Sequence, residues 1–534
     1  MRVYFEFMSS IRTRLIPHLP IIAISLIGLS LRLYDLGGPS LWYDEAATVY
    51  LSHYVPTPGL LFDLAHNMEA PLPAVMVWVW VSVYQLFYDP GLTSAANDFL
   101  LRLLPCLLST LGIPMIYILT RRLVEDRRAA FTAAALFAVS PFQIYYAQEL
   151  RSYAFTASAG LAAVYCCIRA LEDGCKRAHL LLVLLMAALF YNHFTMVWFF
   201  LALNAYALMM VIRMPKRFLP WTLSQITVLI LIAPGVLLAY RANQLWLTVT
   251  DQWVTFPRPT VKTVVLTFKD FFAGYSFSVW AYYALLVLGL VFLVAGFWRL
   301  RRRPTHVLLL ALVIFLPILV NFGFWQLRTL SLYEHRIFIL QGALILIPVS
   351  LGITLLPGRG SWAAALGLFV LLTLPALRDH YTHRLHPVQE HRIGVFDKVA
   401  FRAAARHLQE GWRQGDLLAH DSNFTIYPMK HYLPVPQHHL GMSPQDAALY
   451  IQYMGAEDLL RTHGLLPVPA EEATRGFQRV WLIEAAGITF DAEPQSVAAR
   501  EWLRTRYKEG ETCEAGGVKV TLFALPGTIP PPEE

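Results

Sequence analysis

Eleven apolar runs separated by short polar connections constrain this chain more than any other feature. A helix needs about 20 mostly apolar residues to cross a bilayer. Soluble chains are about 25% charged, whereas only 15% of these 534 residues are charged and 56% are hydrophobic. This balance excludes disordered, fibrous and nucleic-acid-coating proteins and predicts a polytopic α-helical membrane protein. The expected spans are 15–34, 100–120, 129–147, 153–171, 179–192, 195–213, 220–240, 277–298, 306–325, 336–356 and 361–377.

A twelfth apolar run, 71–88, is ambiguous, and charge decides its placement. Lys and Arg favour the cytoplasmic side of short loops. If 71–88 does not span, an N-terminus carrying Arg2, Arg12 and Arg14 and all four strongly basic loops lie on the inside. Those loops are 120–128, 172–179, 212–218 and 298–306. We therefore predict a helix at 71–88 that lies in or against the outer leaflet, with prolines near both ends.

This orientation puts the N-terminus inside and the C-terminus outside. It places the first outer loop (35–99), the loop 241–276 and everything after residue 377 on the outer face of a cytoplasmic membrane. We predict a membrane domain over 1–377 and an extracytoplasmic α/β domain over 378–534. The net charge of +7 follows from the inner loops, so no nucleic acid partner is expected.

The tail has ordinary polarity. Its spacing predicts helices over 395–410 and 496–508, and its short apolar runs beside turn residues predict strands. Those strand candidates are 415–422, 478–486 and 518–525. Four of the five cysteines lie in or beside spans and Cys513 stands alone, so no disulfide framework is predicted.

An acidic pair, Asp44 and Glu45, follows the first span directly. A solvated loop explains it simply, but a carboxylate tuned by its surroundings can also act as a general base toward a hydroxyl. Adjacent helical residues point about 100° apart, so only one of the two is expected to face a substrate. Trp42 and Tyr43 beside them suit either a membrane-interface belt or a wall on which a sugar stacks.

Charged residues also gather at the outer ends of other spans. Glu149 and Arg151 occupy the outer turn between two spans, while Arg102 and Arg336 lie near the outer starts of two more. A local ion pair is the simple explanation for the first two. Ionisable residues at membrane depth are costly and are functional candidates by default. Because the guanidinium fork suits phosphate, the three arginines are candidates to bind a lipid phosphate.

Histidines complete the outer candidates. His193 lies in a tight outer turn and His335 precedes Arg336, although a structural role is the simpler explanation for each. Loop 241–276, with Lys269, is a candidate to close a cleft or to bind an acceptor. The sequence has no Walker A motif, no Gly-rich dinucleotide loop, no HExxH and no GxSxG, so ATP and NAD chemistry find no support.

Taken in order, these segments resemble a known family. They are LRLYDLGGPSLWYDEAATVY (31–50), HNMEAPLPAVMVWVW (66–80), NDFLLRLLPCLLSTLGIPMIYILTRRL (97–123), SPFQIYYAQELRSYAF (140–155), YNHF (191–194) and YEHRIFILQGALILIP (333–348). The set, over about residues 15–356, resembles the GT-C glycosyltransferases that use polyprenyl-phosphate-linked sugars. Within these it is most similar to the protein-mannosyltransferase-like and aminoarabinose-transferase-like group. The resemblance implies a GT-C fold with juxtamembrane helices in the first outer loop.

The resemblance also implies roles for individual residues. Asp44 matches the catalytic base, with Glu45 beside it, and Glu149 and Arg151 match the second outer motif. Arg102 matches an arginine near the lipid phosphate. We therefore predict Asp44, Glu45 and Glu149 as catalytic residues and Arg102, Arg151 and Arg336 as donor-phosphate ligands. Tyr43, Glu69, His193 and His335 are predicted substrate contacts.

The chain departs from the family at one motif. Glu69-Ala70-Pro71-Leu72 stands where a His-Pro-Pro-Leu or Lys-Pro-Pro-Leu stretch is usual, which puts a phosphate contact at Glu69 in doubt. The acids Asp44, Glu45, Glu69 and Glu149 have the chemistry to hold Mg²⁺ or Mn²⁺. Relatives that use sugar monophosphates generally manage without a metal, so no metal or other cofactor is predicted.

The resulting hypothesis is an inverting transfer of a hexose or pentose from a polyprenyl-phosphate donor to a hydroxyl of a glycan, lipid or protein in the cell envelope. The alternatives are a transporter or flippase of a lipid-linked substrate, an oligosaccharide ligase and a non-catalytic scaffold. A transporter predicts charges at mid-bilayer and related halves. Here the charges lie at helix ends, and no repeat of halves is detectable.

Overall fold

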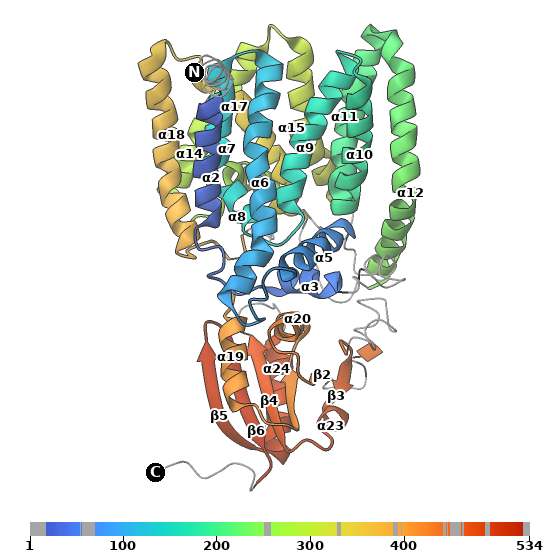
Figure 1. The fold of residues 1–534 in the computed structure, drawn as a ribbon, viewed down its shortest axis with the longest axis vertical. Helices are drawn as coiled ribbons and strands as arrows, with labels where there is room; N and C mark the ends of the chain where they lie inside the picture. The colour runs from blue at the N-terminus through green and yellow to red at the C-terminus, as the bar shows by residue number, and fades with distance from the viewer. Residues whose placement is uncertain are drawn as a thin grey trace, which may run out of the picture. The chain divides into compact units, whose positions relative to one another are not determined.

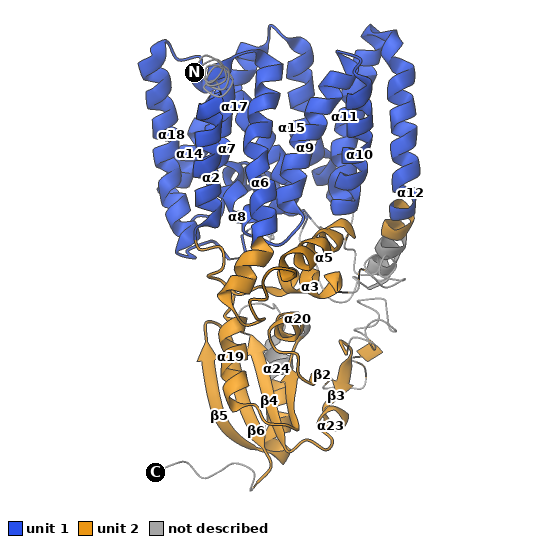
Figure 2. Cartoon of the chain, viewed as in Figure 1, with its two compact units in different colours: residues 1–34, 103–235, 256–395 blue, residues 35–102, 236–255, 396–534 orange. Residues whose placement is uncertain are grey.

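A computed structural model describes residues 18–53, 55, 70–249, 258–327, 333–387, 394–396, 398–441, 445, 447–448, 461, 464–485 and 492–526. Packing divides the chain into two compact units (Figure 2). Unit 1 comprises Met1–Tyr34, Leu103–Gly235 and Phe256–Val395, and unit 2 comprises Asp35–Arg102, Val236–Thr255 and Phe396–Glu534. Two long helices, α6 (Ala95–Val124) and α12 (Phe218–Val249), have residues in both.

Unit 1 is helical (Figure 1). Besides its parts of α6 and α12, its elements are α2 (Leu19–Leu33), α7 (Arg127–Val139), α8 (Pro141–Ala147), α9 (Tyr153–Leu171), α10 (Lys176–Asn192), η2 (Phe194–Met196), α11 (Val197–Arg213), η3 (Pro215–Arg217), α13 (Val261–Ala273), α14 (Val279–Leu300), α15 (Pro304–Gln326), η4 (His335–Phe338), α16 (Ile339–Leu344), α17 (Leu346–Ile353) and α18 (Gly358–Tyr381).

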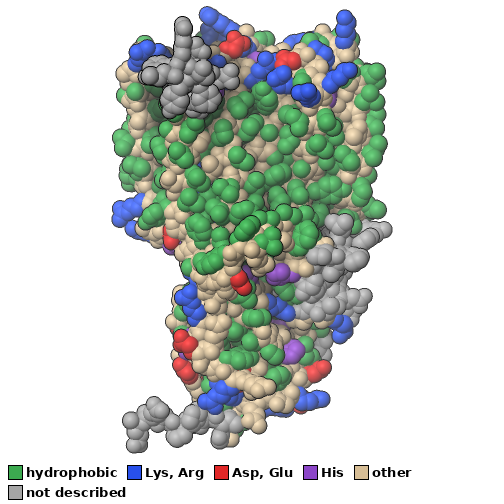
Figure 3. All heavy atoms as spheres, in the orientation of Figure 1, with side chains coloured by type: hydrophobic (Ala, Val, Ile, Leu, Met, Phe, Trp, Pro, Cys, Tyr) green, Lys and Arg blue, Asp and Glu red, His purple; other side chains and the backbone are tan. Residues whose placement is uncertain are grey.

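Helices stand at all eleven predicted spans, and the polytopic fold class is confirmed. The number of spans stays a prediction. In the described parts of the chain, eight helices are long and apolar enough to cross a membrane, or nine if the bent pair α7 and α8 is one span. Helices α2 and α10, with 15 and 17 residues, are shorter. Lys and Arg side chains gather mainly at one edge of the apolar face of unit 1 in view (Figure 3).

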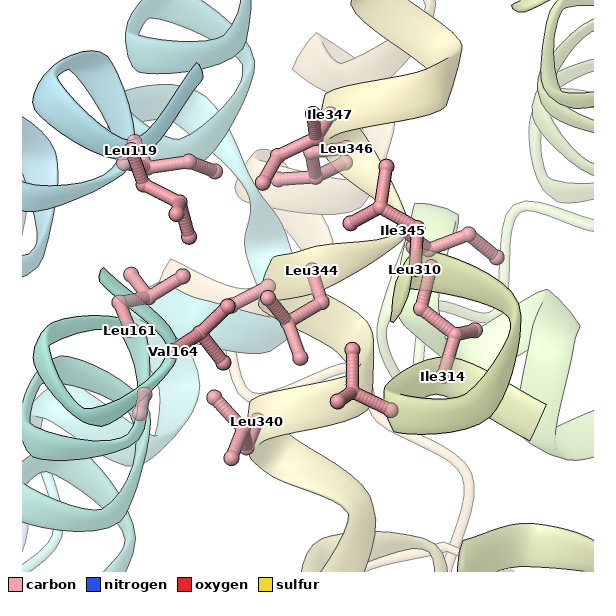
Figure 4. Packing of buried hydrophobic residues seen from close by; sticks show 14 of the residues in the cluster. Leu119, Leu161, Val164, Leu310, Ile314, Leu340, Leu344, Ile345, Leu346 and Ile347 are labelled. Carbon is pink, nitrogen blue, oxygen red and sulfur yellow. The ribbon is translucent and has the colours of Figure 1, made fainter. Parts of the chain in front are cut away.

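The core of unit 1 surrounds the broken helix formed by η4, α16 and α17. Leu340, Leu344 and Ile345 lie between residues of α9 and α15, including Leu161 and Ile314 (Figure 4). All five side chains are fully buried or nearly so. A helix that is apolar on every face belongs in an interior. Its first turn carries His335 and Arg336, which are thereby fixed at the start of the most enclosed helix.

Unit 2 contains helices of the first outer loop together with the C-terminal elements. They are α3 (Tyr43–Ser52), α5 (Leu72–Gln85), α19 (Phe401–Gly411), β1 (Asp416–His420), α20 (Asn423–Tyr432), β2 (Gln437–Gly441), β3 (Pro467–Pro469), α23 (Ala470–Ala473), β4 (Arg479–Ala485), α24 (Ala492–Arg506), β5 (Lys508–Ala515) and β6 (Val518–Ala524). The sequence-based boundary at 377/378 groups this loop with the membrane domain, whereas its described residues pack with the tail.

The C-terminal sheet has the strand order β3-β2-β1-β4-β6-β5. Strands β1 to β4 are parallel, and β6 and β5 are added antiparallel. The three predicted strands correspond to β1, β4 and β6, and the two predicted helices to α19 and α24. The predicted small α/β domain is therefore present.

Helix α5 occupies the ambiguous run 71–88. Its 14 residues reach about 21 Å at 1.5 Å per residue, short of a hydrocarbon core about 30 Å thick. Pro73 lies within its first two positions, where a proline costs no hydrogen bond. The helix packs against α3 within unit 2. Its length agrees with the predicted juxtamembrane helix.

Candidate active site

The acidic pair lies at the start of α3, and the two carboxylates have different surroundings. The side chain of Glu45 is fully buried and turns back to the amide of Trp42, which donates to Oε2 at 3.4 Å. Asp44 is half-buried. Consecutive helical positions diverge by about 100°, which explains how one side chain faces the interior and the other does not. Of the pair, Asp44 is the one accessible to a substrate.

Arg102 on α6 is the partner of Glu45. Its Nε and Nη2 donate to the two carboxylate oxygens at 2.8 and 2.7 Å. The remaining N–H groups donate to the carbonyls of Leu36, Pro39 and Ser40 at 3.2, 2.7 and 2.8 Å. These contacts use all five donors of the guanidinium. The side chain is also 1% exposed.

This geometry argues against two of the predicted roles. Arg102 has no donor left for a lipid phosphate, and Glu45 is a buried counter-ion, to which Lys398 adds a second positive charge at 3.5 Å. A bidentate, fully desolvated Arg–carboxylate pair that also binds the loop carbonyls fixes the chain from Leu36 to Glu45. We assign both residues to holding α3, and hence Asp44, in place.

The two aromatic residues beside the acidic pair, Trp42 and Tyr43, also differ in burial. Trp42 is buried and stacks on Phe396, with ring centroids 5.4 Å apart, so it offers no free face to a sugar. Tyr43 is half-buried and contacts Phe424 and Tyr427 of α20 at 4.9 and 5.3 Å. Of the two predicted stacking residues, only Tyr43 is placed to contact a ligand.

In unit 1, the turn between α8 and α9 carries Glu149 and Arg151. The preceding helices bend by 55° at Ser140, which caps α8 ahead of Pro141. Gln148 holds this turn against the end of α2, because its side-chain amide nitrogen donates to the carbonyls of Arg32 and Tyr34 at 2.9 and 2.8 Å.

Glu149 is 2% exposed and Arg151 is half-buried. The backbone carbonyl of Glu149 accepts from the amide of Arg151 at 2.8 Å. The turn therefore presents one buried carboxylate and one guanidinium from nearly the same point of the backbone.

Electrostatics places His193 and Arg336 with Arg151. Burial, and then the positive charges of Arg151 and Arg336, lower the pKa of His193 to about 4. The ring of Tyr153 lies 6.2 Å from that of His193, and the guanidinium of Arg336 lies 6.0 Å from the Tyr153 ring centroid. Arg336 also donates to Glu334. The structure thus brings together two of the three predicted phosphate-binding arginines.

A buried chain of charges lies on α13 and η4. Lys269 donates to Asp270 at 2.8 Å, and the other carboxylate oxygen bonds to Nδ1 of His335. Burial opposes ionisation of Asp270, but the positive charge of Lys269 and the hydrogen bonds from His335 and Lys269 outweigh it and lower its pKa. Sequence reasoning missed Asp270, because this residue belongs to no motif. Lys269, predicted in a loop that closes or binds an acceptor, is instead buried at 3% exposure.

The hydroxyl of Tyr275 connects these groups. It is hydrogen-bonded to Tyr146 at 2.6 Å, and its pKa is raised well above its usual value, chiefly by burial and then by the charge of Asp270. The charges of Arg336 and Glu149 also act on it. Unit 1 therefore holds a polar cluster whose charges act on Tyr275 from both groups.

Glu69 lies outside the described residues, so its predicted substrate contact stays a prediction. No three His, Cys, Asp or Glu side chains in the described ranges are grouped so that they could hold a metal ion. The remaining site residues fall into two sets. Tyr43, Asp44, Glu45 and Arg102 belong to unit 2, and Glu149, Arg151, His193, His335 and Arg336 belong to unit 1.

Comparison with known proteins matches part of the sequence and nearly all of the fold. A family model described as dolichyl-phosphate-mannose-protein mannosyltransferase matches residues 69–237. Comparison with curated protein sequences gives no match. Arabinosyltransferase EmbB from Mycobacterium smegmatis is 14% identical with a TM-score of 0.39, and covers 70% of this chain and 38% of its own.

Crystal structures of ArnT from Cupriavidus metallidurans, in the apo state and bound to undecaprenyl phosphate, are 12% identical to this chain. Both match with a TM-score of 0.63 over 94% of this chain and 97% of theirs. The resemblance to polyprenyl-phosphate-sugar-dependent enzymes inferred from the motifs is confirmed by these matches. This integral membrane protein has the GT-C fold, and residues 69–237 carry the pattern of mannosyltransferase-like glycosyltransferases.

Proposed function

We propose that the chain is a glycosyltransferase of the cytoplasmic membrane that moves a sugar from a polyprenyl-phosphate donor to a hydroxyl acceptor at the outer face. The observation that carries this proposal is the cluster in unit 1, where the charges of Arg151 and Arg336 both act on the buried His193 and the Arg336 guanidinium lies 6.0 Å from the Tyr153 ring centroid. Such a cluster suits a phosphate group at a membrane surface. The donor class is further supported by the fold shared with an enzyme solved with undecaprenyl phosphate.

In the proposed reaction, Asp44 removes the proton of the acceptor hydroxyl as that oxygen attacks the anomeric carbon. The bond between the anomeric carbon and the phosphate oxygen breaks, and polyprenyl phosphate leaves from the opposite face of the sugar. A single displacement of this kind inverts the anomeric configuration. Neither a metal nor another cofactor is part of the proposal.

The transition state separates charge, and both charges need a partner. Positive charge grows on a sugar ring that resembles an oxocarbenium ion, which the carboxylate of Glu149 is suited to stabilise. Negative charge grows on the leaving phosphate, where Arg151 and Arg336 supply fixed donors. Arg102 is no longer a candidate, because its donors are already used.

The test is a reconstituted transfer assay with labelled polyprenyl-phosphate sugars and an extract of envelope glycans, lipids and proteins. Wild type is expected to form a labelled product of inverted configuration, and Arg151→Met and Arg336→Met are expected to lose at least tenfold in kcat/KM. The matched control is Arg122→Met, which removes a partly exposed arginine paired with Glu172 and Asp173. Product with retained configuration, or full activity in both arginine variants, would contradict the proposal.

The two alternative activities, a flippase and an oligosaccharide ligase, would give different results in this assay. A flippase would move the intact lipid-linked sugar between leaflets without breaking the sugar–phosphate bond. An oligosaccharide ligase would leave single sugars untransferred but would transfer a preassembled glycan. Labelled product from a monosaccharide donor excludes both alternatives.

A further inference from the structure

The chain Lys269–Asp270–His335 is part of the polar cluster of unit 1 but has no task in the reaction proposed above. Asp270 is 0% exposed and His335 is 1% exposed. Lys269 is held by Asp270 at 2.8 Å and by the carbonyl of Gly274 at 3.0 Å, and its ammonium lies 4.8 Å from the Tyr282 ring centroid. The ammonium of Lys269 is therefore fixed, and so is the carboxylate it faces.

These contacts decide which nitrogen of His335 carries the proton. Nδ1 faces a carboxylate oxygen of Asp270, so Nδ1 is the nitrogen that donates. A second proton, on Nε2, would leave two buried cations facing one carboxylate, because Lys269 already balances Asp270. The arrangement therefore favours the tautomer in which Nε2 carries a lone pair and accepts a hydrogen bond.

In the part of the chain that the structure describes, no donor reaches that lone pair. Nε2 of His335 is buried and has no hydrogen-bond partner among the described residues. Leaving a buried acceptor unsatisfied costs about 1–3 kcal/mol, so such a group is usually completed by a ligand or an ordered water. By contrast, His306 of the same unit has both ring nitrogens bonded, to the carbonyl of Leu123 and to Glu172.

We infer that Nε2 of His335, oriented by Asp270, accepts a hydrogen bond from one hydroxyl of the donor sugar and so helps to select which sugar is transferred. This inference rests on the proposed function. A bare lone pair repels a phosphate oxygen but attracts a hydroxyl. Because the neighbouring Arg336 is our candidate for the donor phosphate, the attached sugar is the nearest expected source of hydroxyls. Asp270 and Lys269 are positioning residues for this contact.

The experiment uses the reconstituted full-length protein and compares wild type with variants. The kcat/KM of each is measured with the intact donor and with a series of monodeoxy donors, every one of which lacks a single sugar hydroxyl. In wild type, one deoxy donor is expected to lose about tenfold to hundredfold in kcat/KM. In His335→Phe, the intact donor should show that same loss, and the deoxy donor should show no further loss. His335→Gln, which keeps an acceptor, should retain part of the discrimination and serves if His335→Phe fails to fold.

Asp270→Asn tests the positioning role. An amide that donates to Nδ1 would move the imidazole proton to Nε2 and replace the acceptor by a donor, so discrimination should fall although His335 is intact. His306→Phe is the matched control, and its deoxy penalties should equal those of wild type.

Equal deoxy penalties in wild type and in the His335 variants would overturn the inference while leaving the proposed function in place. Weakened inhibition of His335→Phe by polyprenyl phosphate alone would also overturn it, because it would assign the contact to the phosphate. No transfer by wild type from any donor would instead contradict the proposed function itself.

Discussion

At the scale of single residues, the ion pair between Glu45 and Arg102 shows why a residue type alone does not define its role. An arginine near the outer end of a span has the right chemistry for a phosphate. Its neighbours, however, lie 57 to 66 positions away in the chain, and no local pattern in the sequence reveals them. The sequence therefore indicated the chemistry available to Arg102 but not the buried partners that use all of its donors.

Arg102→Met should be strongly destabilising. It leaves the Glu45 carboxylate buried with only Lys398 nearby, and breaking a buried pair costs about 3–5 kcal/mol. The control Arg122→Met removes a partly exposed ion pair and should cost at most about 1 kcal/mol. Unfolding in detergent measures both. Equal stability of the two variants would show that the buried pair is not structural.

His420 in β1 predicts a pH dependence of stability. It is fully buried between Thr425 and Gln437, and burial lowers its pKa from 6.5 to about 3. On acidification, His420 therefore takes up a proton in the unfolded chain but not in the folded protein. The free energy of unfolding consequently decreases as the pH is lowered below 6.5. Between pH 6.5 and 5 the loss is about 1.5–2 kcal/mol.

Unfolding of wild type and His420→Gln at both pH values measures this term, with the exposed His18→Gln as a control. Between pH 6.5 and 5, His420→Gln should lose about 1.5–2 kcal/mol less stability than wild type. His18→Gln should lose as much stability as wild type. An unchanged slope in His420→Gln would contradict the assignment.

At the scale of elements, apolar length was sufficient to predict where the helices of unit 1 stand, and loop charge favoured a juxtamembrane helix at 71–88, where α5 has 14 residues. Patterning missed β2, β3 and β5. Strand β3 has three residues and two prolines, and β5 is an edge strand with mixed polar residues, so neither shows an apolar run. Asp270 was missed because its helix, α13, lies in a loop without a motif.

The packing of α14 against α17 in unit 1 depends on two glycines. A Cβ on Gly296 of α14 would meet the carbonyl oxygen of Pro348 at 1.7 Å, and one on Gly352 of α17 would meet that of Phe292 at 2.1 Å. Small residues let membrane helices approach at this distance. We predict that Gly296→Ala and Gly352→Ala each cost about 1–3 kcal/mol, because both force α14 and α17 apart.

The control is Gly323→Ala in α15, where a Cβ meets nothing within 4 Å. Alanine favours helix over glycine by about 1 kcal/mol, so this variant should be neutral or slightly more stable. Thermal unfolding of the three variants measures the difference. If Gly296→Ala were as stable as Gly323→Ala, the close packing of α14 and α17 would be wrong.

At the scale of the whole molecule, the predicted orientation assigns the four basic loops to the cytoplasm and residues after 377 to the outside. Two native cysteines test it, because Cys175 lies in an inner loop and Cys513 in the tail, and both are partly exposed. A membrane-impermeant maleimide added to right-side-out vesicles should label Cys513 and leave Cys175 unlabelled until detergent is added. Cys513→Ser should abolish the first signal, and the reverse labelling pattern would invert the proposed topology.

The central claim is that Asp44 is the base of a glycosyl transfer, and the most direct measurement compares transfer by wild type, Asp44→Asn and Asp89→Asn. Asp89 is an exposed acid in the same outer loop, so it controls for the loss of a charge. Removing a general base costs about 10²–10⁴ in rate. We predict that Asp44→Asn loses at least a hundredfold in rate with unchanged thermal stability, while Asp89→Asn transfers at the wild-type rate. Transfer by Asp44→Asn at the wild-type rate would contradict the account.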